Sequence, residues 1–274
     1  MKKYHIHAMY FSGTRTTEKI ITAISKKLSS LIGTDMNVIN ITQPSVRTSP
    51  LSFTSDDLVL FGTPVYAGRI PNILLKYIKT IIGNGAVAVP IVLYGNRNYD
   101  DALIELRSLL EDDGFHTIAA AAFVGEHSFS SVLAAGRPDA DDMKLADTFA
   151  DRIYEKLNST PEPSLLPPVE VKGVIPVRPY YQPHDRNGNA IDIRKVLPKI
   201  SSDCNCCGRC ADICPMGSIS HENIHEYTGI CIKCCACVKL CPQHARYFDD
   251  PGFLYHKEEL EYMFSRRAEV ELFY

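Results

Sequence analysis

Cysteine is the residue type whose placement most narrows the chemistry available to this chain. All ten cysteines of the 274-residue sequence lie between Cys204 and Cys241, so the first 203 residues contain none. A disulfide-stabilised secreted protein spreads its cysteines more widely, whereas crowding of this kind in a chain that we expect to be cytoplasmic is typical of metal binding. The sequence therefore predicts a metal centre in its last third.

Eight of the cysteines form an internal repeat. Two runs have the spacing C-x2-C-x2-C-x3-C, each run is followed by proline, and the second run repeats the first 27 residues later. Structural zinc in two four-cysteine sites is the alternative, but zinc ribbons use two separated C-x2-C pairs, so the spacing favours iron–sulfur clusters. We expect the remaining Cys206 and Cys235 to be small buried hydrophobic residues without a redox role.

The doubled run resembles the cluster-binding sequence of bacterial two-cluster ferredoxins, which form a small α+β domain. In that pattern the first three cysteines of a run surround one cluster and the fourth ligates the other cluster. The resemblance implies two [4Fe-4S] clusters with ligands from both runs. The first ligand set would be Cys204, Cys207, Cys210 and Cys241, and the second Cys231, Cys234, Cys237 and Cys214.

The segment before the cysteines alternates between strand and helix patterns. Apolar runs predict five strands, at 4–11, 36–41, 58–62, 87–94 and 117–124. Apolar residues at helical spacing follow the first, third, fourth and fifth of these runs. Because parallel strands need crossover connections, which are usually helices, the pattern predicts an α/β doubly wound parallel sheet of five strands. We expect the flavodoxin-like order 2-1-3-4-5, with a ligand at the carboxyl ends of the strands.

The chain is predicted to have four parts. The α/β domain covers 1–158, and a proline-rich linker follows over 159–200, which holds eight of the 17 prolines. The cysteine-rich domain covers 201–250, and a helical tail covers 251–274. The apolar end of the tail is expected to dock back on the body of the protein.

The turn after the first strand is rich in hydroxyl groups and leads directly into a helix. Hydroxyls and backbone N–H groups at a helix N-terminus form a site for a phosphate dianion. A single Ser or Thr would be enough for an N-cap, and the sequence has neither a Walker lysine nor a G-x-G-x-x-G motif. The predicted phosphate-binding residues are Ser12, Gly13, Thr14, Arg15, Thr16 and Thr17.

This turn resembles the phosphate loop of flavodoxins, commonly S-G-T-G-N-T, although Arg15 and Thr16 depart from the usual Gly and Asn. The resemblance implies FMN, with two further loops over its ring and with Tyr66 and Tyr99 as stacking partners. His127, after the fifth strand, is a weak candidate for a proton donor, since a lone loop histidine is more often a surface residue. The two ring loops are Thr63, Pro64, Val65, Tyr66, Ala67 and Gly68, and Gly95, Asn96, Arg97, Asn98, Tyr99 and Asp100.

Taken together, the chain is similar to the flavodoxin and ferredoxin fusion proteins of anaerobes. That resemblance implies transfer of electrons from a low-potential donor through two clusters to FMN, and on to a small molecule or a partner protein such as a ferredoxin or reductase. An electron carrier without its own substrate and a redox-sensing protein are the alternatives.

The composition excludes several other classes of function. Hydrophobic residues make up 45% and charged residues 22%, which is typical of a folded soluble domain and not of a disordered chain. The net charge of −3 provides no basic surface for nucleic acid or an anionic membrane. No apolar stretch reaches the ~20 residues that a membrane-spanning helix needs.

Overall fold

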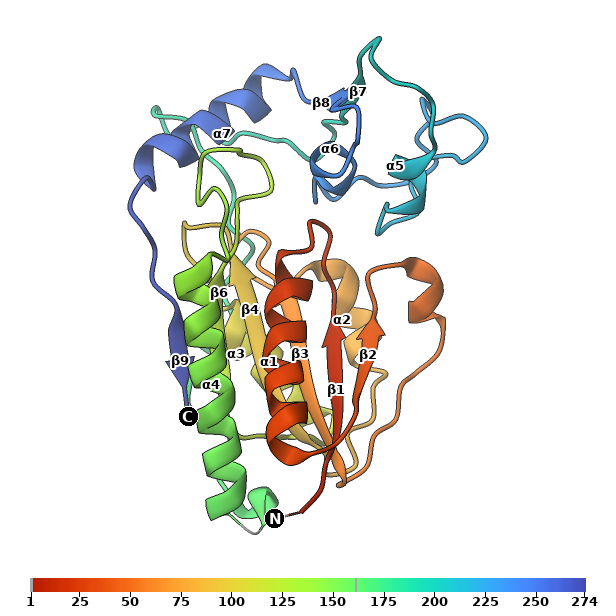
Figure 1. Ribbon diagram of the computed structural model, residues 1–274. Helices are drawn as coiled ribbons and strands as arrows, with labels where there is room; N and C mark the ends of the chain where they lie inside the picture. Colours follow the sequence, from red (N-terminus) through yellow and green to blue (C-terminus); the bar gives the residue numbers. More distant parts are fainter. Residues whose placement is uncertain (1, 161) are drawn as a thin grey trace.

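The apolar runs before the cysteines form one twisted sheet in the computed structural model, which describes residues 2–160 and 162–274 (Figure 1). The parallel strands stand in the order β2-β1-β3-β4-β6, and the two-residue β5 pairs with β4. The fold is therefore a flavodoxin-like α/β parallel sheet. The bounds of these strands are β1 His5–Tyr10, β2 Met36–Asn40, β3 Asp57–Pro64, β4 Val87–Tyr94, β5 His116–Thr117 and β6 Ala120–Val124.

Helices cover both faces of this sheet. α1 (Thr16–Ile32) and α4 (Ala140–Ser159) pack on one face, and α2 (Asn72–Ile78) and α3 (Ala102–Asp112) pack on the other. β3 and β4 are buried along nearly their whole length, as expected for strands covered on both sides. A short 3-10 turn, η1 (Pro44–Thr48), follows β2. The carboxyl ends of the parallel strands therefore meet at one edge.

The predicted strand at 117–124 is divided in the structure, and a proline in its neighbour explains the division. β5 pairs with Val87 and Ala88, whereas β6 pairs with β4 only from Ile91 onward. Pro90 lies between these two ladders and has no N–H to donate. An extra residue bulges in the partner strand at this point, which ends β5 and starts β6.

The tail is helical only in its first part. α7 covers Pro251–Met263, but the chain then crosses to the edge of the sheet and ends in β9 (Glu271–Phe273), which pairs antiparallel with β6. The sheet thus has seven strands in place of the predicted five. The antiparallel strand at this edge has a physical reason. Without β9, the backbone N–H and C=O groups on the outer side of β6 would lack hydrogen-bond partners.

The proline-rich linker lies along the α/β domain. After η2 (Pro163–Leu165), the buried Val169 donates its N–H to the Thr117 carbonyl at 2.9 Å. Further along, the Arg178 guanidinium binds both carboxylate oxygens of the buried Asp101 at 2.8 and 2.6 Å. This pairing lowers the pKa of Asp101 to about 2.

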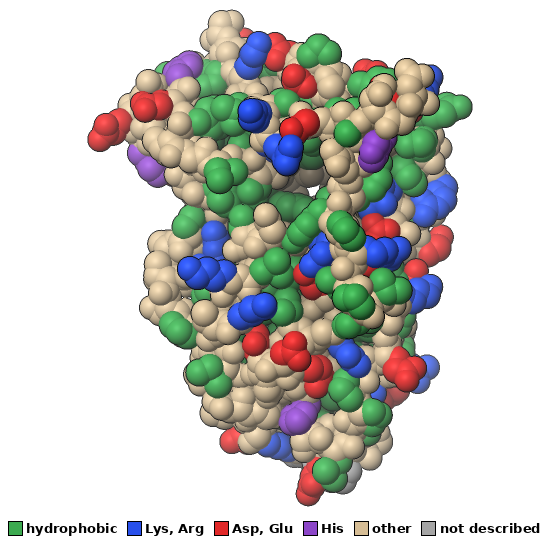
Figure 2. All heavy atoms as spheres, turned by 180° about the vertical axis from the view of Figure 1, so that it is seen from behind, with side chains coloured by type: hydrophobic (Ala, Val, Ile, Leu, Met, Phe, Trp, Pro, Cys, Tyr) green, Lys and Arg blue, Asp and Glu red, His purple; other side chains and the backbone are tan. Residues whose placement is uncertain are grey.

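The cysteine-rich region (residues 199–250) lies above the carboxyl ends of the strands, and α7 lies beside it (Figure 1). Figure 2, seen from behind, shows hydrophobic side chains in the indentation between this upper part and the α/β domain. The region has a two-stranded ladder and two short helices. These elements are β7 Lys199–Ile200, β8 Arg246–Tyr247, α5 Arg209–Asp212 and α6 Ala236–Lys239.

The 27-residue sequence repeat is also a backbone repeat. Cys206 and Lys233 both have φ of 55°, and Gly208 and Cys235 have φ of 76° and 59°. α5 and α6 follow at the same offset. Cys235 is buried as expected, at a position where the first half has glycine, whereas Cys206 is exposed, so the expectation of burial was wrong for Cys206.

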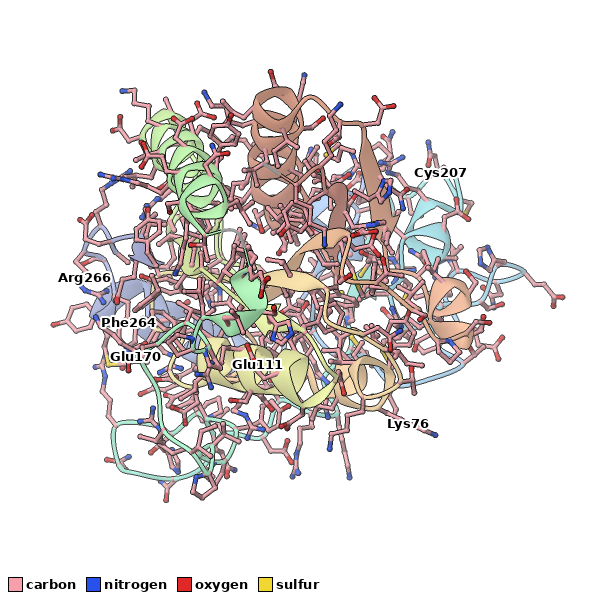
Figure 3. All side chains as sticks on the ribbon, turned by 90° about the horizontal axis from the view of Figure 1, so that it is seen from below. Lys76, Glu111, Glu170, Cys207, Phe264 and Arg266 are labelled. Carbon is pink, nitrogen blue, oxygen red and sulfur yellow. The ribbon has the colours of Figure 1, made fainter. Side chains whose placement is uncertain are left out.

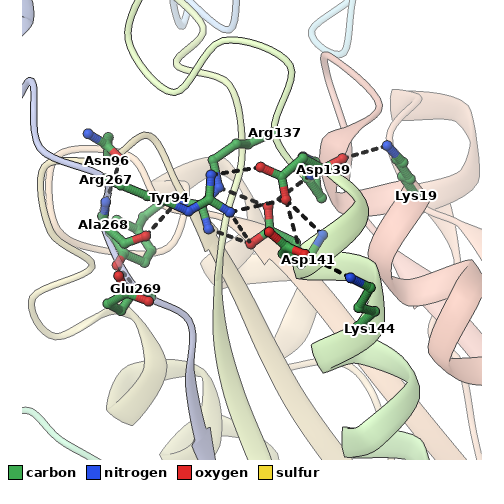
Figure 4. Close-up of polar contacts among 12 residues, drawn as sticks. Lys19, Tyr94, Asn96, Arg137, Asp139, Asp141, Lys144, Arg267, Ala268 and Glu269 are labelled. Atoms are coloured by element: carbon green, nitrogen blue, oxygen red, sulfur yellow. Dashed lines mark hydrogen bonds and ion pairs between the residues drawn. The ribbon is translucent and has the colours of Figure 1, made fainter.

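A buried ion pair joins the start of α4 to the tail (Figure 4). The Arg137 guanidinium pairs with Asp142, and both side chains are at most 5% exposed. The same guanidinium donates to the Ala268 carbonyl at 2.5 Å, and Asp139 caps α4 through a reciprocal capping box with Asp142. Among the described residues, no helix is long and apolar enough to cross a bilayer.

Removing the charge of Asp142 should therefore be costly. We expect Asp142→Asn to lower the free energy of unfolding by about 3–5 kcal/mol, because Arg137 is left as an uncompensated buried charge. Lys144→Ala, which removes only the exposed pair with Asp141, should cost less than about 1 kcal/mol. Urea unfolding followed by circular dichroism measures both. Equal midpoints for the two variants would contradict the buried pair.

Candidate functional site

A cavity of about 460 Å³ opens at the carboxyl ends of β1, β3, β4 and β6, which is the edge predicted to bind a ligand. Four loops of the α/β domain and one side chain of the cysteine-rich region form its walls. The lining residues are Ser12, Gly13, Thr14, Thr16, Thr17, Pro64, Val65, Tyr66, Leu93, Tyr94, Gly95, Gly125, Glu126, His127, Ser128 and Cys234.

The loop that forms one wall of the cavity has a row of free backbone donors. Among the described residues, no acceptor binds the N–H groups of the five consecutive residues 13–17. They stand at the N-terminus of α1, a helix of 17 residues whose dipole favours negative charge at this end. Five unpaired donors beside a cavity are costly unless an acceptor completes them. This wall is suited to an anion with several oxygen atoms.

The sequence shapes this loop through Ser12 and Arg15. Ser12 donates its N–H to Thr42 Oγ1 at 2.9 Å, and its Oγ accepts the N–H of Glu18 at 3.1 Å. Arg15, with φ of 67°, turns the chain into α1. Its side chain is exposed and does not line the cavity, so the structure does not bring Arg15 to the predicted site. Ser12 thus positions the loop, and Gly13, Thr14, Thr16 and Thr17 line the cavity beside it.

The loop after β3 contributes a tyrosine. Tyr66 and Arg69 exchange both backbone hydrogen bonds, at 2.8 and 3.1 Å, around a tight turn. Ala67 and Gly68 take positive φ there, of 51° and 78°, which a type I′ turn requires. Pro64, Val65 and Tyr66 line the cavity, as predicted for this loop. Thr63 is fully buried within β3, and Ala67 and Gly68 form the turn itself, so these three do not line it.

The loop after β4 serves another purpose than the one predicted. Only Gly95 lines the cavity. Asn96 donates from Nδ2 to the carbonyls of Phe264 and Arg266, both at 2.6 Å, and accepts the Ala268 N–H at 3.2 Å. The side-chain amide of Asn96 is therefore hydrogen-bonded to the backbone of the tail.

Tyr99, in the same loop, also has a different role from the predicted one. Its ring is buried against Tyr94, with centroids 5.5 Å apart, and its hydroxyl donates to Glu271 of β9 at 3.0 Å. Arg97 pairs with Asp100 and lies over the Tyr181 ring, and Asn98 accepts the Asp100 N–H. The assignment of Tyr99 as a ring-stacking partner is therefore wrong, because the hydroxyl anchors the last strand.

His127 lies in the cavity wall, flat against Gly95, where a side chain on residue 95 would collide with the imidazole. Its Nδ1 accepts the Phe129 N–H at 3.1 Å, which leaves the proton of the neutral ring on Nε2. Burial is the main reason that the pKa of His127 falls to about 4, and the nearby His256 lowers it further. At neutral pH, His127 is a hydrogen-bond donor and not a cationic acid.

Two smaller cavities lie within the cysteine-rich region, and each contains one of the ligand sets implied by the ferredoxin resemblance. The cavity that contains the second set measures about 400 Å³ and is almost wholly apolar; the other measures about 310 Å³. We name them the inner and outer cysteine cavities. The inner cavity has Cys214, Cys231, Cys234 and Cys237 in its walls, together with Cys235, and the outer has Cys204, Cys207, Cys210 and Cys241.

The donor atoms around both cysteine cavities are thiol sulfurs. Within the described residues, no group of three or more His, Cys, Asp or Glu side chains is placed so that it could hold a metal ion. Burial raises the pKa values of Cys231 and Cys234, and that of Cys237 to about 12, so their thiolates require a positively charged partner. Backbone N–H groups approach Cys214 Sγ and Cys241 Sγ, each at 3.4 Å.

Cys234 belongs to both the large cavity and the inner cysteine cavity. A Cβ atom built on Gly13 would lie 3.3 Å from Cys234 Cβ and 3.7 Å from its Sγ. The loop that contains Gly13 thus lies close to the inner cysteine set. Glycine at position 13 permits this approach.

Polar contacts hold the cysteine-rich region over the cavity. Lys239 of α6 pairs with Glu126 at 2.6 Å, and Glu126 also accepts the Gly136 N–H at 2.9 Å. On the other side, Arg47 donates to the carbonyls of Ile41 and Pro215, at 2.6 and 2.8 Å. Because both contacts are partly buried, they resist displacement by water better than surface pairs do.

Five of the six predicted phosphate-loop residues and three residues of the β3 loop line the cavity. The sequence did not indicate that Leu93, Tyr94, Gly125, Glu126, Ser128 and Cys234 line the cavity. Glu126 and Ser128 follow the last parallel strand, so the strand-end rule could have found them. Nothing local in the sequence indicates that Cys234 reaches Gly13.

No family model and no curated protein matches this chain. Among solved structures, a flavodoxin from the domain Archaea is similar, with 14% identity and a TM-score of 0.41 over 57% of this chain and 99% of that one. An apo NADH:FMN oxidoreductase is similar with 18% identity and a TM-score of 0.41, over 58% of this chain and 92% of that one. A Streptococcus pneumonia TIGR4 flavodoxin has 19% identity and a TM-score of 0.40, over 55% and 98%. At these values the flavodoxin-like assignment depends on the strand order and connections described above.

Lowering the pH tests the environment of His127. Because the folded protein favours the neutral rings of His127 and His256, whose pKa values both fall to about 4, protonation below the ordinary value of 6.5 favours the unfolded chain. Stability should therefore decline as the pH falls from 6.5 toward 4. In nuclear magnetic resonance spectra both rings should stay neutral from pH 7 to 5, with His127→Gln identifying its signal. A His127 titration centred near pH 6.5 would refute this environment.

Proposed function

We propose that this protein is an iron–sulfur flavoprotein that transfers electrons from a low-potential donor through two [4Fe-4S] clusters to FMN, and on to an acceptor. The observation that carries the proposal is the shared position of Cys234, in the wall of the large cavity and in the inner cysteine cavity. A flavin site and a cluster site with a common wall suit electron exchange.

The large cavity supports FMN as its ligand. The five free amides of residues 13–17 would bind the terminal phosphate, with the hydroxyls of Thr14, Thr16 and Thr17 beside it. Tyr66 would border the ring system, and the Nε2–H of His127 would offer it one donor. Bound FMN supplies exchange of one or two electrons. One terminal phosphate, without a dinucleotide fingerprint, favours FMN over FAD.

The two cysteine cavities support the clusters. Each would provide four thiolates from both sequence runs, in apolar surroundings that favour cluster stability and exclude water. The N–H groups of Ser218 and Ala245, at equivalent positions of the repeat, would donate to ligand sulfurs and tune the reduction potentials. The proposed partner is a one-electron redox protein, such as a ferredoxin or a reductase.

Cofactor analysis of the anaerobically isolated protein tests the proposal. We expect about eight irons, about eight acid-labile sulfides and one FMN per chain, because each cysteine set holds one cubane cluster. Iron and sulfide assays and chromatography of the extracted flavin give the result. Zinc in place of iron, or FAD in place of FMN, would overturn the assignment.

A charge placed in the anion-binding loop tests the phosphate site separately. Thr14→Asp should weaken FMN binding at least 100-fold, since two anions about 4 Å apart repel by roughly 4 kcal/mol in partly buried surroundings. Thr14→Asn has the same shape without the charge and should weaken binding less than tenfold. Titration of the metal-containing apoflavoprotein with FMN, followed by fluorescence, measures both. Similar losses for Asp and Asn would place the phosphate elsewhere.

A further inference from the structure

The two cysteine sets lie at unequal distances from the flavin cavity. Cys234 of the inner set is part of the cavity wall, whereas none of the cysteines of the outer set lines it. Gly13, in the proposed phosphate loop, packs directly on Cys234. The inner set therefore has the shorter route to any ligand of the cavity.

The outer set lies at the opposite end of the cysteine-rich region. Cys207 is exposed, as is the neighbouring Cys206, whereas Cys234 and Cys237 of the inner set are buried. In Figure 3, Cys207 lies at the periphery of the molecule. An external protein can therefore approach the outer set more closely than the inner one.

From these positions we infer that the cluster held by Cys214, Cys231, Cys234 and Cys237 is the immediate electron partner of the flavin, and that the cluster held by Cys204, Cys207, Cys210 and Cys241 receives electrons from outside. This inference rests on the proposed function and assigns a direction to it. The order cannot be read from the chain, because each set combines cysteines of both runs.

The electron balance is simple. A reduced one-electron carrier protein loses one electron to the outer cluster, which passes it to the inner cluster, and both clusters return to their oxidised state once the electron reaches the flavin. Two such transfers, with protons taken from water, complete the two-electron reduction of FMN. Since transfer between sites slows steeply with distance, the order of the clusters determines the route.

A matched pair of variants tests the order. Cys214 and Cys241 occupy the same position of the repeat, and each sulfur accepts an N–H bond at 3.4 Å, but they belong to the inner and outer sets respectively. Cys214→Ala should remove the inner cluster and Cys241→Ala the outer one. Each variant should retain about four irons per chain.

The readout is the phosphorus resonance of bound FMN in the dithionite-reduced protein. A paramagnetic inner cluster next to the Gly13 loop should broaden this line, so it should sharpen at least twofold in Cys214→Ala and stay within a tenth of the wild-type width in Cys241→Ala. The opposite pattern, or equal sharpening, would overturn the order. Wild-type protein without iron or FMN would instead overturn the proposed function.

A second measurement uses the unaltered holoprotein, in case a variant fails to assemble. Limited oxidation with ferricyanide, followed by alkylation and mass spectrometry, reports which thiols lose their cluster first. We expect the outer set to be alkylated before the inner set. Prior alkylation of the inner set, Cys214, Cys231, Cys234 and Cys237, would contradict the inference.

Discussion

The contact between Gly13 and Cys234 is the constraint on which the rest of the structure depends. It joins the first turn of a parallel sheet to a cysteine loop more than 200 residues away, at a separation where a Cβ atom on residue 13 would lie only 3.3 Å from Cys234 Cβ. The large cavity and the inner cysteine cavity share Cys234 as a lining residue. The pairs of Lys239 with Glu126 and of Arg47 with the Pro215 carbonyl hold it on two sides.

The linker and tail explain how so small a cysteine-rich region keeps its position. The linker is fastened to the α/β domain by Arg178 and Asp101, and to α7 by the pair of Arg186 with Glu259. After α7 the chain returns to the sheet as β9. The cysteine-rich region is therefore attached at both of its ends. A region held in this way has less freedom to rotate away from the cavity than one on a single flexible linker.

Local patterns predicted most of the α/β fold and part of the site. Apolar runs and helical spacing were sufficient for the parallel strands, because both faces of the sheet are buried and the pattern is strong. The loop before α1 was predicted as part of the ligand site because anion binding at a helix N-terminus depends on consecutive residues, and five of its residues line the cavity. The division of β5 from β6 follows from Pro90. The sequence shows this proline, but it does not show which strand pairs with it.

The failures at Asn96, Tyr99 and the tail involve contacts between distant segments. Asn96 and Tyr99 were assigned to a ligand because they follow a strand, yet the returning tail binds them first, and β9 itself was hidden in a segment read as helical. The sequence also did not indicate that Cys234 lines the cavity. In each case the sequence showed what kind of contact the side chain could make. Which residue it contacts depends on the tertiary fold.

The most direct test of this account is an anomalous-scattering map at the iron absorption edge, from crystals of the anaerobically isolated protein with FMN bound. The account predicts iron density in both cysteine cavities, with the density between Cys214 and Cys234 nearer to the flavin and its phosphate on the amides of residues 13–17. Iron density absent from the cavities, or an outer cluster nearer to the flavin than the inner one, would contradict it.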